Sequence, residues 1–315
     1  MSGKREDPPS NLRSLDVRID NLARERGRPV RRIQRALANA VVGQILPPGV
    51  VKGGTAMKLR VGEAASRFTP DLDVARLGSV TLDDYLDELA HRLATGWGGF
   101  TGTVEQLEAP QPTGVPEDYV MLPFLIRLAY RGRHWLTVRF ELSHDEIDST
   151  NEPELRIADD IVELFDVLGL ATPNPIPVLA IDHQIAQKLH ACTSINAKTG
   201  GNERAHDLVD LQILALEETI DMRAVGATSR RLAARRSQSW PPTVVAYEGW
   251  DTIYTEAADG LGVDRQRYRC RRLGERVHRS SSRLNQLAAQ RLFHPTFTQH
   301  FASKRVPVRP DVSSR

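Results

Sequence analysis

Residues 52–73 read KGGTAMKLRVGEAASRFTPDLD, and this stretch decides the fold more than any other part of the chain. An apolar pair at 50–51 leads into a turn at Gly53-Gly54-Thr55, and Asp71 and Asp73 follow with one leucine between them. Glycine lets backbone N–H groups approach a phosphate, and a helix that begins there adds its positive end. Because alternate residues of a strand point the same way, Asp71 and Asp73 share one face. Two carboxylates beside such a turn suit paired Mg²⁺ ions and phosphoryl-group transfer.

Each half of this pattern has an ordinary alternative, namely an exposed glycine turn or a solvated acidic strand end. The complete pattern is more specific, because the blocks KGGTAMKLR, RFTPDLD, IAQKLHA (185–191) and RAHDLVDLQ (204–212) occur in this order. In these blocks the chain resembles the AbiEii/AbiGii-type nucleotidyltransferase toxins, including the mycobacterial MenT group. The resemblance runs from about Asn11 to about Gly262, and we expect the chain to depart from the family from about Asp264 onward.

The resemblance implies an α/β fold in which a nucleotidyltransferase domain with a mixed sheet precedes a helical domain. It also implies an Mg²⁺-dependent enzyme that transfers NMP from an NTP, with CTP or UTP favoured, to the 3′ end of tRNA. Such transfer blocks aminoacylation, so translation halts. A cognate antitoxin protein would hold the toxin in check. Some relatives are silenced by phosphorylation at a hydroxyl residue that corresponds to Thr69, and the alternative is that Thr69 only caps the turn before Pro70.

The first half of the expected site holds the nucleotide and the metal. We expect Asp71 and Asp73 to bind Mg²⁺, and the triphosphate to be held by a set that shares one turn: Lys52, Gly53, Gly54 and Thr55. Arg67 could contact phosphate, and a salt bridge to Asp71 or Asp73 is an equal alternative.

A third carboxylate is expected from the strand 135–142, where polar and apolar residues alternate. Trp135, Thr137, Arg139 and Glu141 fall on one face, and the residues between them belong to the core. We expect Glu141 to place a metal or activate the acceptor hydroxyl. The alternative is a surface glutamate paired with Arg139.

The second half of the expected site lies in two helices. Lys188 would be a solvated residue by its position alone, but the family's matching lysine lies in the active site and would neutralise the triphosphate. Asp207 and Asp210 are three apart on the next helix, hence on one face. We expect Asp210 to act in catalysis and Asp207 to be structural. A structural partner for a buried aspartate here is Arg204 or another cation, and a functional partner is Lys188 or the nucleotide. His190 and His206 are expected to pack or form hydrogen bonds, because no further ligand is spaced for a metal.

The pattern of apolar residues predicts three parts: 1–172, the nucleotidyltransferase domain with two N-terminal helices; 173–263, the helical domain; and 264–315, a basic tail that is partly disordered. A linker is expected at Pro173–Pro177. The predicted helices are 10–26, 29–45, 81–94, 157–170, 182–195, 204–217, 228–236 and 250–260, and the predicted strands are 100–107, 124–130 and 135–142. The outer face of the second helix carries Arg28, Arg31, Arg32 and Arg35, which form either a solvated face or a contact for RNA phosphates.

The composition limits the classes of protein to which the chain can belong. The 315 residues are 40% hydrophobic and 26% charged, with no apolar run long enough for a membrane and no signal-peptide core, so we expect a cytoplasmic protein. Two distant cysteines exclude a disulfide framework and a zinc site. Residues 264–315 carry 13 basic and 3 acidic residues, against 29 and 37 in the rest. The tail is either without function or an attractor for tRNA. Two other functions stay open: a nucleotidyltransferase that modifies a small molecule or protein, and a non-catalytic RNA-binding protein.

Overall fold

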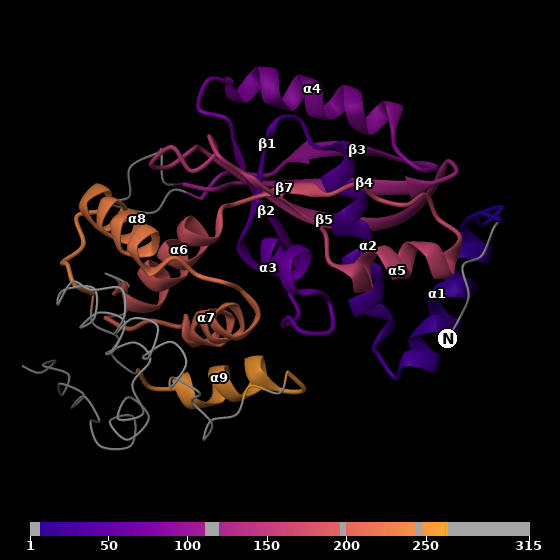
Figure 1. Cartoon of the computed structure of the whole chain (residues 1–315). Coiled ribbons are helices and arrows are strands. Elements are labelled where there is room, and N and C mark those ends of the chain that lie inside the picture. The colour runs from indigo at the N-terminus through magenta and orange to yellow at the C-terminus, as the bar shows by residue number, and fades with distance from the viewer. Residues whose placement is uncertain (1–6, 111–119, 196–199, 243–246, 262, 264–315) are drawn as a thin grey trace, which may run out of the picture. The chain divides into compact units, whose positions relative to one another are not determined.

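The structure is a computed structural model, and it describes residues 7–110, 120–195, 200–242, 247–261 and 263 (Figure 1). The predicted tail, 264–315, lies outside the described residues. The chain divides into two compact units, Met1–Gln184 and Ile185–Arg315, which are described separately below.

Five helices of the first unit are described: α1 (Leu12–Arg26), α2 (Val30–Ile45), α3 (Gly53–Val61), α4 (Leu82–Thr95) and α5 (Asp159–Leu168). Helix α1 is capped by Asn11, whose side chain accepts a hydrogen bond from Ser14 N. It ends at Gly27, which takes the left-handed conformation (φ 59°) that closes a helix at low cost. Pro29 precedes α2, where its fixed φ suits the entry to a helix.

The first unit is built on a seven-stranded mixed sheet (Figure 1). Its strands are β1 (Gly49–Lys52), β2 (Asp71–Arg76), β3 (Phe100–Gln106), β4 (Leu122–Tyr130), β5 (Arg133–Ser143), β6 (Glu154–Arg156) and β7 (Ile176–Val178), in the order β3-β4-β5-β2-β1-β7-β6. Strand β2 runs parallel to β5 and antiparallel to β1. The hairpin between β4 and β5 turns at Arg131 and Gly132, as predicted, and both residues have positive φ. The sequence did not predict β6 and β7.

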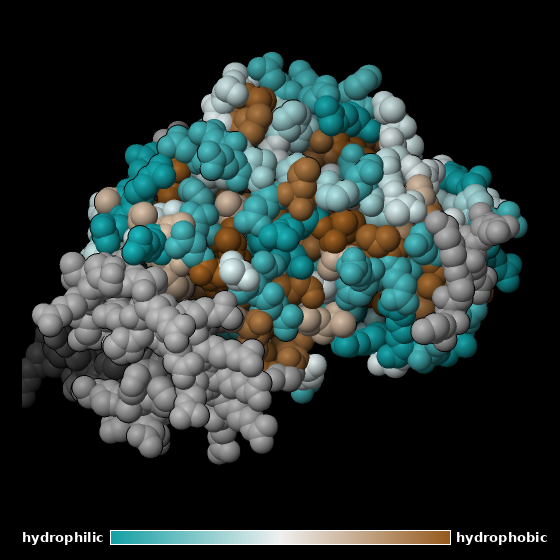
Figure 2. All heavy atoms as spheres, viewed as in Figure 1, coloured by the Kyte–Doolittle hydropathy of each residue, from teal (hydrophilic) through white to brown (hydrophobic). Residues whose placement is uncertain are grey.

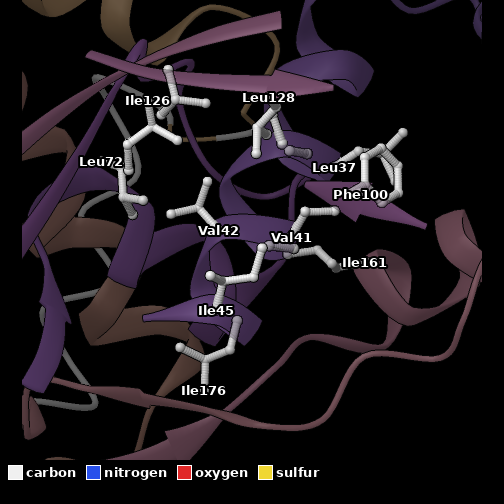
Figure 3. Packing of buried hydrophobic residues seen from close by; sticks show 14 of the residues in the cluster. Leu37, Val41, Val42, Ile45, Leu72, Phe100, Ile126, Leu128, Ile161 and Ile176 are labelled. Atoms are coloured by element: carbon white, nitrogen blue, oxygen red, sulfur yellow. The ribbon is translucent and has the colours of Figure 1, made fainter. Parts of the chain in front are cut away.

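One face of the sheet is apolar and packed against helices. Leu72, Ile126 and Leu128 point into a cluster with Leu37, Val41 and Val42 of α2, which Figure 3 shows. Helices α4 and α5 add further side chains to the same cluster, among them Leu89, Leu93, Ile161 and Phe165. This packing removes one side of β2 and β5 from solvent, so the alternate residues of both strands point to the opposite face.

The second unit is helical in its described residues. Its helices are α7 (Ala205–Glu217), α8 (Met222–Arg235) and α9 (Trp250–Ala258), and α6 (Ile181–Thr193) begins in the first unit and ends in the second. Helices α7 and α9 are joined by a hydrogen bond from Tyr254 OH to Gln212 Oε1 (2.6 Å), and Trp250 is buried and donates to the carbonyl of Asn202.

The division at Gln184/Ile185 falls later than the expected boundary at 172/173. The expected linker contributes a strand, because Ile176–Val178 pairs with both β1 and β6. The fold class is otherwise the one expected from the sequence, a mixed α/β domain followed by helices. In the described part of the chain, no helix has both the length and the apolar character needed to cross a bilayer.

Candidate active site

Asp71 and Asp73 lie on the open face of β2. Leu72 between them is fully buried, whereas both aspartates are half-buried. In the register of the sheet, Asp73 lies beside Lys52 of β1 on one side and beside Glu141 of β5 on the other. Asp71 lies beside Arg139. The predicted alternation of β5 is confirmed from Leu136 to Leu142, and it brings a third carboxylate to the neighbouring strand. Trp135 was expected on the same open face, but it lies at a register shift between β4 and β5 and packs against the apolar cluster instead.

The two glycines are required because side chains from the acidic segment lie against them. A Cβ on Gly53, whose φ is +63°, would stand 1.8 Å from Asp73 Oδ2. A Cβ on Gly54 would stand 2.8 Å from both Cβ and Oγ1 of Thr69. Only glycine allows the first turn of α3 to approach β2 this closely. The N-cap residue, Lys52, makes no side-chain cap hydrogen bond, so the first N–H groups of α3 are not capped by it.

Thr55 ties the helix to the strand. Its hydroxyl donates to the carbonyl of Asp71 (2.9 Å) and accepts from Asn39 Nδ2 of α2 (2.9 Å), and only 1% of the residue is exposed. The hydroxyl expected to contact the triphosphate therefore fixes the position of Asp71. The sequence did not predict Asn39, although an asparagine within the apolar run of a helix was a signal of a buried hydrogen bond.

The carboxylates keep features of a cation site. Asp71 Oδ1 is buried and has no hydrogen-bond partner among the described groups. Burial and the nearby charges of Asp73 and Asp71 raise the pKa of Glu141, although Lys52 and Arg139 oppose the shift. No three His, Cys, Asp or Glu side chains of the described residues are arranged to hold a metal together. Mg²⁺ needs less than this, because it commonly binds one or two carboxylates, waters and substrate phosphates. Asp71 and Asp73 fit that requirement.

The arginines of α2 make contacts within the first unit. Arg32 bonds Glu63 Oε1 (2.5 Å) and the carbonyls of Glu63 and Ser66, and Arg35 donates to the carbonyl of Thr137 (3.1 Å). Burial, Arg31 and Arg139 lower the pKa of Arg35, and Asp71 opposes this shift. Arg31 is exposed over the ring of Phe68 (5.2 Å to its centroid). Arg31 and Arg32 thus contact the loop that leads into Asp71, and Arg35 contacts β5. RNA binding by Arg28, Arg31, Arg32 and Arg35 stays a prediction.

Lys58 is a buried cation that sequence reasoning did not single out. It is 1% exposed, its Nζ has no hydrogen-bond partner among the described groups, and it lies 5.9 Å from the centroid of Phe68. Burial lowers its pKa to about 8, which the nearby Glu63 only partly opposes. A lysine six residues after the strand, within KGGTAMK, resembles any helix-surface lysine, so no sequence signal marked it.

In the second unit, Lys188 joins the two aspartates of α7. Its Nζ donates to Asp207 Oδ1 (3.2 Å) and Asp210 Oδ2 (2.5 Å), and Arg204 Nε donates to Asp207 Oδ2 (2.7 Å). Lys188 is 5% exposed and each aspartate is 1% exposed. Two cations thus balance two buried carboxylates. Arg204 and Lys188, two of the alternative partners expected for these aspartates, both bond to Asp207.

The remaining predicted residues are placed as follows. Thr69 is buried against Gly54, and Arg67 is half-buried in the same loop. His190 Nδ1 shares a hydrogen bond with Gln238 Oε1 (2.5 Å), and His206 Nε2 lies 3.6 Å from Asp207 Oδ2. The histidines therefore form polar contacts, as expected.

Comparison with known proteins agrees with the expected family. A family model described as "Nucleotidyl transferase AbiEii toxin, Type IV TA system" matches residues 35–291. The match begins later than Asn11 and continues past Gly262, so the end expected for the resemblance was too early. No curated protein matches the chain. Among solved structures, the chain is similar to MenT4, a nucleotidyltransferase toxin from Mycobacterium tuberculosis, with 19% identity and a TM-score of 0.43 over 83% of this chain and 91% of that one.

Proposed function

Because this chain belongs to the AbiEii family of nucleotidyltransferase toxins, we propose that it transfers NMP from an NTP to the 3′ end of a tRNA. CTP or UTP is the favoured donor. The observation that carries the proposal is the set of three carboxylates on neighbouring strands, Asp71, Asp73 and Glu141, beside the glycine turn that begins α3. A tRNA extended in this way is no longer a substrate for aminoacylation, and translation stops.

The nucleoside triphosphate binds at the start of α3. The N–H groups of Gly53, Gly54 and Thr55 and the positive end of the helix attract its phosphates. Lys52 and Arg67 add positive charge from the end of β1 and from the loop before Asp71. The close approach of Gly53 to Asp73 supports this arrangement, because it places the phosphate-binding turn directly beside the acidic strand.

Asp71 and Asp73 hold Mg²⁺ in this proposal. The metal supplies charge that stabilises the phosphoryl group and the pyrophosphate that leaves. The buried, unpartnered oxygen of Asp71 supports a ligand role, since a carboxylate oxygen kept from water costs free energy unless a cation or donor meets it. The hydrogen bond from Thr55 to the backbone of Asp71 fixes the position of that residue.

Glu141 takes the proton of the acceptor hydroxyl. The 3′ hydroxyl oxygen attacks the α-phosphorus, the bond to the β-phosphate oxygen breaks, pyrophosphate leaves, and the hydroxyl proton passes to the Glu141 carboxylate. A raised pKa supports this role, because it brings the carboxylate closer to the acidity that suits proton transfer near neutral pH.

Lys188 and Asp210 are required for turnover in this proposal, with Lys188 supplying positive charge to the triphosphate. The burial of both residues in one ion network supports a defined geometry for the lysine. Phosphorylation of Thr69 would silence the enzyme, because it would bring negative charge against Asp71 and Asp73. The partners are the tRNA acceptor end and a cognate antitoxin, in the cytoplasm.

One experiment tests this function against the alternatives. The full chain is incubated with each labelled NTP, Mg²⁺ and a mixture of total RNA, cell protein and small molecules, and the labelled species is identified. Label at the 3′ end of tRNA supports the proposal. Label only on a protein or a small molecule contradicts the acceptor, and RNA binding with no label on any species contradicts the enzyme.

A further inference from the structure

Arg139 of β5 is an exposed residue on the open face of the sheet, beside the carboxylates of the proposed active site. In the register of β2 and β5 it lies next to Asp71, as Glu141 lies next to Asp73. The alternative expected for Glu141, an ion pair with Arg139, is not formed within the described part of the chain. Burial raises the pKa of Glu141, and Lys52 opposes this shift more strongly than Arg139 does. Glu141 therefore does not neutralise Arg139.

Arg127 of β4 is a second exposed arginine on this face, and it differs from Arg139 in its partner. Its Nη2 lies 2.7 Å from Oε2 of Glu105 in β3. In the register of β4 and β5, Arg127 lies opposite Thr137, two residues along the strand from Arg139. The two arginines thus share a sheet face, but the paired one lies farther along β5 from Asp71.

A further arginine adds positive charge near Asp71. Arg35 of α2 donates from Nη1 to the carbonyl of Thr137 (3.1 Å), and its Nε is buried without a hydrogen-bond partner among the described groups. Burial and Arg31 lower the pKa of Arg35, and Arg139 adds to this shift. The positive charges of Arg35 and Arg139 therefore act on one another, and a bound anion would relieve their repulsion.

Positive charge is not a general property of the surface of the first unit. The surface over α4 is mainly hydrophilic in Figure 2, and Asp83, Asp84 and Asp87 are exposed on that helix. Such a surface repels an RNA backbone. The arginines near Asp71 therefore mark a particular place for a phosphate group.

We infer that Arg139 binds the last phosphodiester of the acceptor RNA, with Arg35 adding charge at the same place. The inference rests on the proposed function, in which the 3′ hydroxyl gives its proton to Glu141. Residues two apart on a strand stand roughly 6.6 Å apart, and the last phosphodiester of an RNA lies one sugar away from the 3′ hydroxyl. Guanidinium groups bind phosphate through paired, charge-assisted hydrogen bonds. Arg139 thus favours an acceptor whose hydroxyl has a phosphate one sugar away, which a protein hydroxyl does not offer.

The donor triphosphate fits Arg139 less well because of the order of the strands. The phosphate-binding turn at Gly53 follows β1 and approaches Asp73 from that side of β2. Arg139 lies on the other side of β2, in β5. The donor and the acceptor therefore bind on opposite sides of the acidic strand.

The test compares two variants of the full chain, Arg139→Gln and the matched control Arg127→Gln. The control removes the same charge and breaks an exposed ion pair of little energetic weight. Initial rates are measured over a range of tRNA and NTP concentrations, beside thermal unfolding. A second acceptor is the same tRNA with its last phosphodiester replaced by a neutral methylphosphonate, which removes the charge and keeps the 3′ hydroxyl.

We expect Arg139→Gln to lower kcat/KM for tRNA by about 10- to 100-fold, as loss of a hydrogen bond to a charged group implies, and to leave KM for NTP unchanged. Arg127→Gln should keep the wild-type values. The methylphosphonate should slow the wild type by a similar factor and should slow Arg139→Gln no further, because both changes remove one interaction.

Several results overturn the inference while labelling of tRNA by the wild type still upholds the proposed function. They are a wild-type kcat/KM for tRNA in Arg139→Gln, equal losses in both variants, and a further loss when Arg139→Gln receives the methylphosphonate. A rise in KM for NTP alone also overturns it, and assigns Arg139 to the donor. A wild type that labels another acceptor, or none, overturns both.

Discussion

Two pairs of aspartates, one in each unit, differ in the charged groups that surround them. Asp71 and Asp73 are half-buried on a strand, next to a third carboxylate whose pKa is raised. One oxygen of Asp71 is buried and has no hydrogen-bond partner among the described residues. Asp207 and Asp210 are almost fully buried on a helix, and Lys188 and Arg204 bond to them. We propose that the first pair receives a metal ion, whereas the second is bonded to Lys188 and Arg204.

This difference separates two demands on the same side chain. A buried carboxylate with its own cation contributes to a defined fold, and removal of one partner leaves an uncompensated charge. A carboxylate at a half-open strand end can be lost with little effect on packing. We therefore expect loss of the strand pair to affect activity alone, and loss of the helix network to affect stability as well as turnover.

The largest expected effect is on transfer. Asp71→Asn and Asp73→Asn should each lower the rate of nucleotidyl transfer by about 10³-fold or more, because the metal would lose a charged ligand. The midpoint of thermal unfolding should stay close to that of the wild type. Initial rates with labelled NTP and tRNA, measured beside unfolding curves, check both parts.

A matched control for these variants is Asp83→Asn, which removes an exposed carboxylate from α4. It should keep the wild-type rate. Full activity in either Asp71→Asn or Asp73→Asn, with normal unfolding, would contradict the assignment of the metal to this strand.

The second effect is on stability. Lys188→Met should lower the free energy of unfolding by about 3–5 kcal/mol, because it leaves the Asp210 carboxylate buried without its bonded cation. Adding Asp210→Asn to the same chain should restore part of this loss. Denaturant unfolding of the single and double variants measures both. If Lys188→Met unfolds like the wild type, the network does not support the fold, and the comparison between the two aspartate pairs breaks.

The sequence predicted the strand pair well because its signal is local. Two aspartates two apart, after a glycine turn, share a face in any strand, and the alternation around Glu141 follows the same rule. The structure confirms both, together with the helices α1, α2, α4, α5, α6, α7 and α9 to within a few residues at their ends. The four blocks that carry the family resemblance fall within the range matched by the family model.

Other features depend on contacts between distant segments, which periodicity does not report. Strand β7 was hidden by its prolines, and it exists because β1 and β6 lie on either side of it. The outer arginines of α2 predicted either a solvated face or a contact for RNA phosphates, and neither predicted that Arg32 bonds the loop of Glu63 and Ser66. From its position in the sequence, Lys58 resembles a surface residue, but in the fold it is buried.

Lys58 sharpens the comparison, because it is a buried lysine without the aspartates that Lys188 has. Its pKa in the folded protein is about 8, below the ordinary 10.5, so the fold disfavours the charged form. The free-energy cost of burying the charged amine has its full value below about pH 8, and it vanishes above the pKa of Lys58 in the unfolded chain. Stability should therefore rise by roughly 3 kcal/mol between pH 8 and 10.5 through this group.

Lys58→Met should remove that rise and be more stable than the wild type at pH 7. Denaturant unfolding of both proteins at several values of pH measures the difference, in which all other titrating groups cancel. A difference that stays constant from pH 7 to pH 10 would show that Lys58 is not the group at work.

The smallest effect is expected at Glu141, where the transfer rate depends on the protonation of one carboxylate. Burial and the neighbouring aspartates raise its pKa in the metal-free protein, and Mg²⁺ bound to those aspartates would oppose their contribution. The transfer rate should fall as the pH is lowered through the pKa of Glu141. Glu141→Gln should be slower by about 10- to 100-fold at neutral pH, and its profile should lack this acidic limb.

The same raised pKa changes the free energy of unfolding with pH in the direction opposite to its effect on the transfer rate. A raised carboxyl pKa means that the folded protein favours the protonated form, so this contribution is complete at low pH and is lost as the pH rises through the folded value. Glu141→Gln, which cannot ionise, should therefore be no less stable than the wild type at pH 7. Glu108→Gln, at an exposed position, is the matched control and should keep both the rate and the acidic limb. If Glu141→Gln retains the acidic limb, the proton acceptor is another group, and Glu141 contributes only its negative charge beside Asp73.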